Sequence, residues 1–118
     1  IALEDMGDLS MKAKEFLTLS NQCVVFAETE IISLVNEGKE IPDIVAALHR
    51  AVANRAASLA RSISVETDVV MTGGVAKNSG MFTALQSALG VEIKRVSEPQ
   101  IAGALGAALI ARDMLVAV

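Results

Sequence analysis

The order of patterns after Ile41 predicts an α/β fold, in which helices pack as a sandwich on a sheet. Residues 41–63 have apolar side chains at helical spacing, and residues 68–72 form a short apolar run without alternation, typical of a strand covered on both faces. A further helical segment, a strand-like segment and a last helical segment follow. The resulting alternation of helix and strand is typical of α/β proteins.

The segment 41–63 has the most regular helical pattern in the chain. Pro42 suits its first turn, because proline lacks an N–H that this turn would leave unpaired anyway. His49 lies beside Arg50, opposite much of the apolar stripe, so we expect it at the surface or at an interface. It is the only histidine, which excludes a metal cluster built from several histidines within this sequence. The stripe itself comprises Ile41, Ile44, Val45, Leu48, Val52, Ala56, Leu59 and Ile63.

The segments before this helix have weaker patterns. Residues 8–19 have a weak helical pattern, and residues 23–27 form a short apolar run that suits a strand. Residues 28–36 are expected to form a short helix that ends at Gly38. Glu28 and Glu30 are two positions apart and would point to different sides of this helix, so a solvated helix start is favoured over an acid/base pair.

The segments after residue 72 have clearer boundaries. Ser79–Leu89 is predicted to form a helix that Asn78 caps and Gly90 ends. Residues 91–96 alternate weakly, as a strand does, and a last helix is expected from residues 98–99 to about 115. The methionines at positions 71 and 81 are expected to fill the core.

Composition excludes several classes of protein. The 118 residues, 53% hydrophobic and 20% charged, predict one compact soluble domain. Net charge is −4 and the ten basic residues are scattered, so we expect neither nucleic acid nor an anionic membrane as partner. The apolar runs are shorter than the roughly 20 residues of a membrane span. With a single cysteine, the chain is expected in the cytoplasm, and its first residue, Ile1, suggests a piece of a longer polypeptide.

The stretch VVMTGGVAKNSG places a glycine pair at a strand-to-helix turn. Gly73 and Gly74 would let the backbone approach a ribose or phosphate, the helix start would favour an anion, and Thr72 and Asn78 add hydrogen bonds. The alternative is a tight turn that only lets strand and helix pack closely. The spacing does not match the GxGxxG fingerprint or a P-loop, and Lys77 is expected to face solvent rather than a phosphate.

The last helix contains small residues on neighbouring faces. Gly103 and Gly106 each cost about 1 kcal/mol relative to alanine inside a helix, so close contact with another helix is expected there. Ala107 and Ala108 extend the small surface. The helix suits either a tightly packed core or a hinge on which two lobes slide.

Three separated stretches resemble a known family. VVMTGGVAKNSG, VEIKRV and EPQIAGALGAALIA resemble the adenosine motif and second connecting helix of the actin, sugar kinase and heat-shock-70 ATPase superfamily. CVVFAETEIISLVNEGK and IPDIVAALHRAVANRA, followed by TGGVAKN, resemble more narrowly the ATPases that activate 2-hydroxyacyl-CoA dehydratases and the ATP-binding subunits of benzoyl-CoA reductases. The resemblance extends from residue 22 to residue 113.

The resemblance implies a fold and an activity. The fold would be part of one lobe of an actin-like, ribonuclease H-like ATPase, a mixed sheet flanked by helices, with residues 1–118 as the C-terminal segment of the second lobe. The activity would be ATP-driven transfer of a low-potential electron to a CoA-ester reductase or dehydratase. The implied partners are that enzyme and a second identical or paralogous ATPase subunit. ATP or ADP with magnesium would bind at Thr72, Gly73, Gly74, Val75, Ala76 and Asn78.

Cys23 has two interpretations. Taken by itself, a lone cysteine before an apolar run is a small buried hydrophobe. The resemblance instead implies a thiolate ligand of a four-iron, four-sulfur cluster shared between two subunits, each giving two cysteines. On that interpretation Cys23 lies at the exposed edge of its short strand, and the second cysteine lies upstream.

The family's two phosphate loops have no counterpart here, because no DxGxT-like or DxGGQD-like stretch occurs. We therefore assign no catalytic residue and expect no ATP hydrolysis by this segment alone. Two alternatives stay open: a sugar or acyl-phosphate kinase of the same fold, and a non-catalytic interaction domain. An upstream cysteine would favour the electron-transfer ATPase. A cluster of Asp and Asn residues that binds a sugar would favour the kinase, and loss of both phosphate loops would favour the interaction domain.

Overall fold

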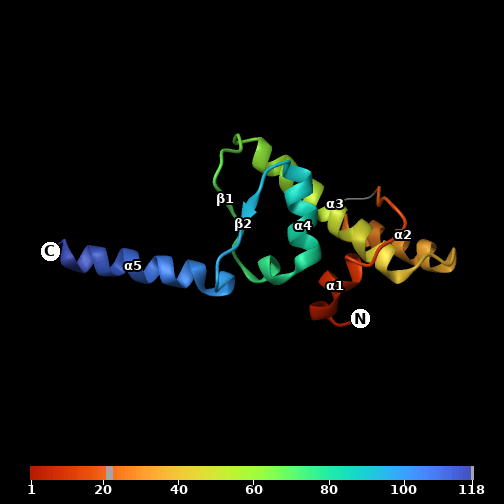
Figure 1. Ribbon diagram of the computed structural model, residues 1–118, viewed down its shortest axis with the longest axis horizontal. Helices are drawn as coiled ribbons and strands as arrows, with labels where there is room; N and C mark the ends of the chain where they lie inside the picture. The colour runs from red at the N-terminus through yellow and green to blue at the C-terminus, as the bar shows by residue number, and fades with distance from the viewer. Residues whose placement is uncertain (21–22, 118) are drawn as a thin grey trace.

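The computed structural model describes residues 1–20 and 23–117 (Figure 1). Its two strands form a parallel sheet in which Val69 pairs with Ile93 and Val70 with Lys94. The predicted α/β order after Ile41 is confirmed. The elements in chain order are η1 Leu3–Asp5, α1 Met6–Ser10, α2 Val24–Asn36, α3 Ile41–Arg61, β1 Val69–Val70, η2 Gly74–Lys77, α4 Ser79–Leu89, β2 Ile93–Lys94, η3 Pro99–Ile101 and α5 Ala102–Val116.

Helix α3 is the centre of the packing, between α1, α2 and α4 (Figure 1). Pro42 occupies its first turn, as predicted. Half of its buried residues are alanines, which let the neighbouring helices approach closely; the buried residues are Asp43, Ile44, Val45, Ala46, Ala47, His49, Ala53 and Ala57. On the side that faces α2, an apolar cluster forms from Leu17, Ile44 and Ala47, with Leu19, Ile31 and Leu34 packed against it.

Helix α4 begins and ends at the predicted residues. The side-chain Oδ1 of Asn78 accepts a hydrogen bond from the N–H of Met81 at 2.9 Å, which caps the helix. Gly90 follows with φ +72°, the left-handed conformation that suits glycine after a helix. Met81 and Phe82 are buried, so the prediction that Met81 fills the core is confirmed. The guanidinium of Arg61 donates to the carbonyl of Ala88 near the end of α4.

The helix predicted over residues 8–19 is wrong, because α1 ends at Ser10. The chain that follows is held by side chains of α3 instead of its own helical hydrogen bonds. The Asp43 carboxylate accepts from the N–H groups of Lys14 and Glu15 at 2.6 and 2.9 Å. Arg50 donates to the carbonyl of Leu17 at 2.6 Å. These tertiary contacts leave no trace in the local pattern of residues 8–19.

The strand predicted over residues 23–27 is also wrong. Helix α2 begins at Val24, and the N–H of Ala27 donates to the carbonyl of Cys23 at 2.9 Å, as in a first helical turn. A short apolar run does not distinguish a strand from a helix, and packing on α3 selects the helix here. The predicted end is confirmed, because α2 stops at Asn36 and Gly38 has φ +79°.

The strand predicted over residues 68–72 is shorter than expected and is not covered on both faces. Strand β1 comprises two residues, and the side chain of Val70 is 49% exposed. Strand β2 likewise keeps only the middle of the predicted segment 91–96. The described residues contribute one parallel pair, so the predicted mixed sheet is represented here only by its parallel part.

The last helix begins as predicted, with η3 at Pro99 leading into α5, and it extends away from the rest of the chain (Figure 1). A Cβ at Gly103 or Gly106 would meet nothing within 4 Å, so the expected contact with another helix is not made within the described residues. Residues Pro99–Val116 are long and apolar enough to cross a membrane, although the apolar runs suggested otherwise. Helices of soluble proteins pass the same test of length and composition.

Candidate functional site

The glycine turn joins β1 to α4. Gly73 has φ +90° and ψ 174°, a conformation that side chains with a Cβ rarely adopt, and a Cβ there would meet nothing within 4 Å. Its N–H donates to the carbonyl of Pro99 at 2.7 Å and ties the turn to η3. Gly74 starts η2 with a Cβ position 3.3 Å from the Gln100 side chain. The turn is therefore fixed in shape while one surface of it stays open.

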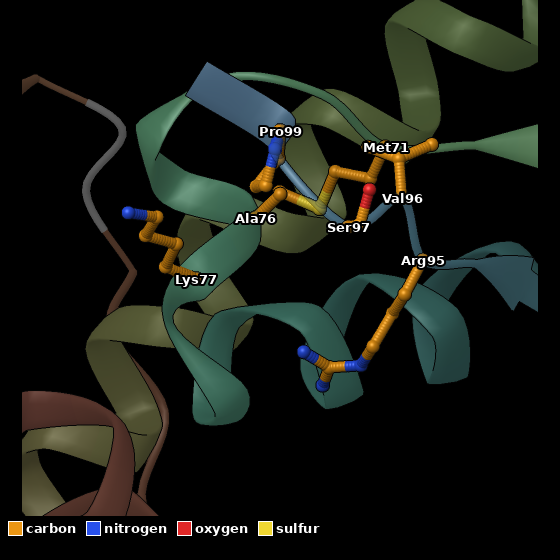
Figure 2. Close-up of a pocket in the computed structure, with 7 residues that line it drawn as sticks. All are labelled: Met71, Ala76, Lys77, Arg95, Val96, Ser97 and Pro99. Carbon is orange, nitrogen blue, oxygen red and sulfur yellow. The ribbon is translucent and has the colours of Figure 1, made fainter. Parts of the chain in front are cut away.

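A depression of about 180 Å³ lies beside this turn (Figure 2). Met71 follows β1 and Arg95 follows β2, so the depression lies at the edge where both parallel strands end. Ligands of open α/β sheets bind at this edge. The guanidinium of Arg95 lies 3.8 Å from the centre of the Phe82 ring. The lining residues are Met71, Ala76, Lys77, Arg95, Val96, Ser97 and Pro99.

The structure places the predicted nucleotide-binding residues in one continuous turn. Thr72, Gly74 and Val75 are exposed, and Ala76 is buried against the depression. Asn78 is used as the cap of α4. The N–H of Gly73 donates to the carbonyl of Pro99 and is therefore not open to a ligand. What Gly73 supplies is the shape of the turn.

Several lining residues were not predicted. Arg95 and Ser97 follow the second strand, and the rule that parallel strands end at one edge would have found them, whereas Pro99 belongs to η3. Met71 lines the depression and is half-buried, so the prediction that it fills the core is wrong. Lys77 is exposed as predicted, and its side chain borders the depression (Figure 2).

His49 is buried, with 6% of its surface exposed, so its predicted surface position is wrong. Asn78 Nδ2 lies 3.3 Å from His49 Nε2, which brings the histidine to the end of the glycine turn. Burial lowers the pKa of the imidazole below its ordinary value of 6.5. The sequence pattern missed this position because α3 is covered here by small residues of α1 and α4, among them Gly7 and Gly80, and not by a second apolar stripe.

Cys23 is exposed, as predicted, but it precedes a helix and not a strand. It occupies the cap position of α2, a helix of 13 residues, with extended backbone at φ −85° and ψ 130°. This exposed position leaves Cys23 open to a soft metal or cluster that approaches from outside. Within residues 1–20 and 23–117 no group of three or more His, Cys, Asp and Glu side chains is placed to hold a metal.

The two glutamates of α2 have separate environments. Glu28 is exposed, in line with the predicted solvated surface. The carboxylate of Glu30 accepts hydrogen bonds from the backbone N–H of Ser20, at 3.0 and 3.1 Å, and from its hydroxyl at 3.1 Å. Glu30 thus holds the preceding segment against α2.

Comparison with known proteins decides the family. The model of the BadF/BadG/BcrA/BcrD ATPase family matches residues 1–111. The chain belongs to this family. An ATPase that activates (R)-2-hydroxyglutaryl-CoA dehydratase in Acidaminococcus fermentans is 46% identical over 111 residues, 94% of this chain and 43% of the relative. The 2-hydroxyisocaproyl-CoA dehydratase activator of Clostridioides difficile is 44% identical over 113 residues, 96% of this chain and 42% of the relative.

The fold of this BadF/BadG/BcrA/BcrD-family chain is also similar to that of a solved structure. The activator of the 2-hydroxyisocaproyl-CoA dehydratase from Clostridium difficile, with bound ADPNP, superposes with a TM-score of 0.92 at 44% identity. The match covers 97% of this chain and 42% of that one. The predicted membership of an actin-like ATPase fold is confirmed. The chain spans less than half the length of the curated relatives it matches.

Proposed function

We propose that this chain supplies the adenosine side of the nucleotide site in an ATPase that drives low-potential electron transfer to a CoA-ester dehydratase or reductase. The observation that carries the proposal is the open glycine turn beside a depression at the carboxyl edge of the sheet, in a chain closely similar to dehydratase activators. The activator that superposes on it was solved with an ATP analogue, which supports nucleotide binding at this fold. On this proposal residues 1–118 form the C-terminal segment of the second lobe.

The depression suits a nucleoside by its chemistry. The side chains of Met71, Ala76 and Val96 offer an apolar surface for a base, and the hydroxyls of Thr72 and Ser97 are suitable partners for a ribose. The open space at Gly73 and the exposed backbone of Gly74 leave room for the sugar to approach. Magnesium and the phosphates beyond the first would be held mainly by the part of the protein that carries the phosphate loops.

Cys23 is proposed as one ligand of a four-iron, four-sulfur cluster shared between two subunits. Its exposure and its place at the start of α2 fit a thiolate that a cluster can reach. Such a cluster takes four thiolates, so one cysteine in this sequence requires a second from elsewhere in the same protein and two from a partner subunit. The partner would be an identical or paralogous ATPase subunit. The electron would pass to a CoA-ester enzyme, in the cytoplasm, without nucleic acid or membrane.

The nucleotide proposal is tested by Gly74→Val. Gly74 has no positive φ, and its Cβ position faces only the flexible Gln100 side chain, so the fold should tolerate the substitution while the added methyl groups fill the ligand's space. We expect loss of ADP and ATP binding in calorimetric titration of the full-length protein. Thr83→Val, on the exposed side of α4, is the control and should bind normally. Unchanged affinity in a folded Gly74→Val protein would contradict the proposal.

The cluster proposal is tested by Cys23→Ser in the anaerobically reconstituted full-length protein. Serine keeps the size but removes the sulfur that iron prefers, so iron, sulfide and cluster absorbance should be lost while ADP binding stays. A fully loaded variant would remove Cys23 from the site.

A further inference from the structure

His49 lies in the middle of α3, at the point where α1 and α4 meet it. A Cβ on Gly80 would come within 2.8 Å of His49 Nδ1 and 3.0 Å of the carbonyl of Gly7, and it would overlap the hydroxyl of Ser10. The imidazole therefore rests directly on the first turn of α4, without a side chain between them. Its position relative to the glycine turn is set by close packing.

The hydrogen bonds of Asn78 fix how the histidine meets this turn. Asn78 Oδ1 accepts from the N–H of Met81 at 2.9 Å, which identifies the oxygen end of the amide. The nitrogen end, Nδ2, then donates to His49 Nε2 at 3.3 Å. Asn78 also donates its backbone N–H to Val75 at 3.0 Å, inside η2. One residue thus joins the glycine turn, the start of α4 and the buried histidine.

An accepting Nε2 requires a neutral imidazole with its proton on Nδ1. Nδ1 is buried and has no hydrogen-bond partner among the described residues. Protonation would turn Nε2 into a donor that faces the Asn78 amide donor, which breaks the hydrogen bond. The imidazole can hold Asn78 only in its neutral form.

Among residues 1–20 and 23–117, burial is the one influence that shifts the pKa of His49, and no acidic group opposes it. Residues 79–89 of α4 contain no titratable side chain, and Asp8, the only one in α1, accepts from the hydroxyl of Ser79 at 3.5 Å. On α3 itself the neighbour Arg50 is cationic and engages the Leu17 carbonyl and the Phe16 ring. Burial without a counter-charge therefore favours the neutral imidazole.

We propose that His49 is a positioning residue for the nucleotide site: its neutral imidazole holds Asn78 and so keeps residues 72–78 in the shape that receives the nucleotide. This inference rests on the proposed function of the glycine turn. His49 acts through Asn78 and touches no ligand itself. Acidification that charges His49 releases Asn78 and loosens the turn.

Two substitutions separate positioning from packing. His49→Leu fills much of the space but has no acceptor for Asn78 Nδ2, and ADP affinity in the full-length protein should fall about three- to tenfold, the effect of one lost hydrogen bond. His49→Gln restores a carbonyl acceptor and should recover most of that loss. Val45→Ala is the control, because Val45 is a buried α3 residue whose aliphatic side chain cannot hydrogen-bond to Asn78: it should lower the melting temperature without lowering ADP affinity. An equal loss of affinity in Val45→Ala would overturn the proposal.

The pH dependence of ADP affinity distinguishes the two roles, because a residue that only packs would not change it. Because burial lowers the pKa of His49, ADP affinity in the wild type should decrease only as the pH falls below about 6.5. The phosphates of ADP titrate in the same range, so the His49→Leu protein is the reference. The contribution of His49 is the difference between the pH dependence of ADP affinity in the wild type and that in His49→Leu. Identical profiles in the two proteins would contradict the proposal.

A measurement without nucleotide keeps this inference separate from the proposed function. The side-chain amide resonances of Asn78 and the backbone amide of Met81, followed by nuclear magnetic resonance, should shift as His49 titrates in the wild type. Hydrogen exchange at Met81 should quicken in His49→Leu. If the protein bound no ADP, the proposed function would fail while these shifts still tested the contact. Asn78 resonances that ignore both the titration and the substitution would exclude His49 as its positioning residue.

Discussion

The glycine turn and the Cys23 segment are the two regions to which function is assigned, and they are built in opposite ways. Hydrogen bonds hold the turn at both ends: Gly73 donates to Pro99, and Asn78 is hydrogen-bonded to Met81 and His49. Cys23 occupies the cap position of α2 without a side-chain hydrogen bond to the helix, and the residue is exposed. The contrast teaches that contacts within this chain hold the turn in shape, whereas for Cys23 the structure shows only an exposed side chain at the start of a helix.

The largest change in the free energy of unfolding is expected at Gly80, where the residues next to the turn pack most closely. Gly80→Ala places a methyl group against Ser10, His49 and the backbone of Gly7, and backbone cannot move aside easily. Overpacking of this kind lowers the free energy of unfolding by about 1–3 kcal/mol. Chemical denaturation of the variant measures it.

Gly106→Ala is the matched control, because the same substitution meets open space on α5. Alanine is the better helix former, so stability should rise by up to about 1 kcal/mol. A fall in stability would show that another part of the protein packs closely on α5, as the small residues of that helix suggest.

Removing the cap of α4 should have the next largest effect. Asn78→Ala deletes the acceptor for the N–H of Met81 and the donor to His49. Loss of a cap of this type costs about 1 kcal/mol, and urea denaturation measures it. Asn78→Asp keeps the cap oxygen but loses the amide donor, so it should retain most of the stability. Equal losses in the two variants would mean that the cap contributes little.

The same contrast explains which predictions succeeded. Helix α4 was predicted to the residue because its signals are local: an asparagine accepts from the backbone three residues later, and a glycine adopts a left-handed conformation after the last turn. The glycine pair was recognised by the same kind of chemistry. Such signals depend on neighbours in the sequence, and no long-range contact overrides them here.

The failures lie where distant contacts decide the structure. The conformation of residues 8–19 is set by hydrogen bonds to Asp43 and Arg50 of α3 and not by their own helical pattern. His49 is buried and lies against Gly80 of α4, far from it in sequence, so the stripe of large apolar residues on α3 gave no sign of its burial. In the candidate site, Arg95 and Ser97 were missed because they join the glycine turn only through strand pairing.

Asp43 tests how far α3 controls the segment that leads to Cys23. Two backbone N–H groups, those of Glu15 and Lys14, hold the pKa of its carboxyl below the ordinary value of 3.8. Because the folded pKa is the lower one, this stabilisation is present above pH 3.8 and is lost as the pH falls through the folded pKa. Asp43→Asn keeps an acceptor without a charge, so its unfolding free energy should depend less on acidic pH. Denaturant titrations over the acidic range compare the two proteins.

Parallel pH profiles for wild type and Asp43→Asn would mean that the contact with the N–H groups of Lys14 and Glu15 is not made in solution. The ion pair of Lys39 with Glu15, 2.7 Å apart on the surface, is the control. Salt should weaken that pair, but it should leave the acid profile of Asp43 in place.

The smallest effect is expected at Cys23 in protein that carries no cluster. Its side chain is exposed and lies at the cap position of α2, where serine is among the preferred residues. Cys23→Ser should therefore change the free energy of unfolding by no more than about 0.5 kcal/mol, as is usual for surface substitutions. Anaerobic reconstitution should change this result. A cluster that binds only the folded protein stabilises it by mass action, so wild type should gain resistance to unfolding on loading and the serine variant should not. A large difference between the unloaded proteins would instead show that Cys23 packs against another part of the full-length chain, and the thiolate would then not be open to a cluster.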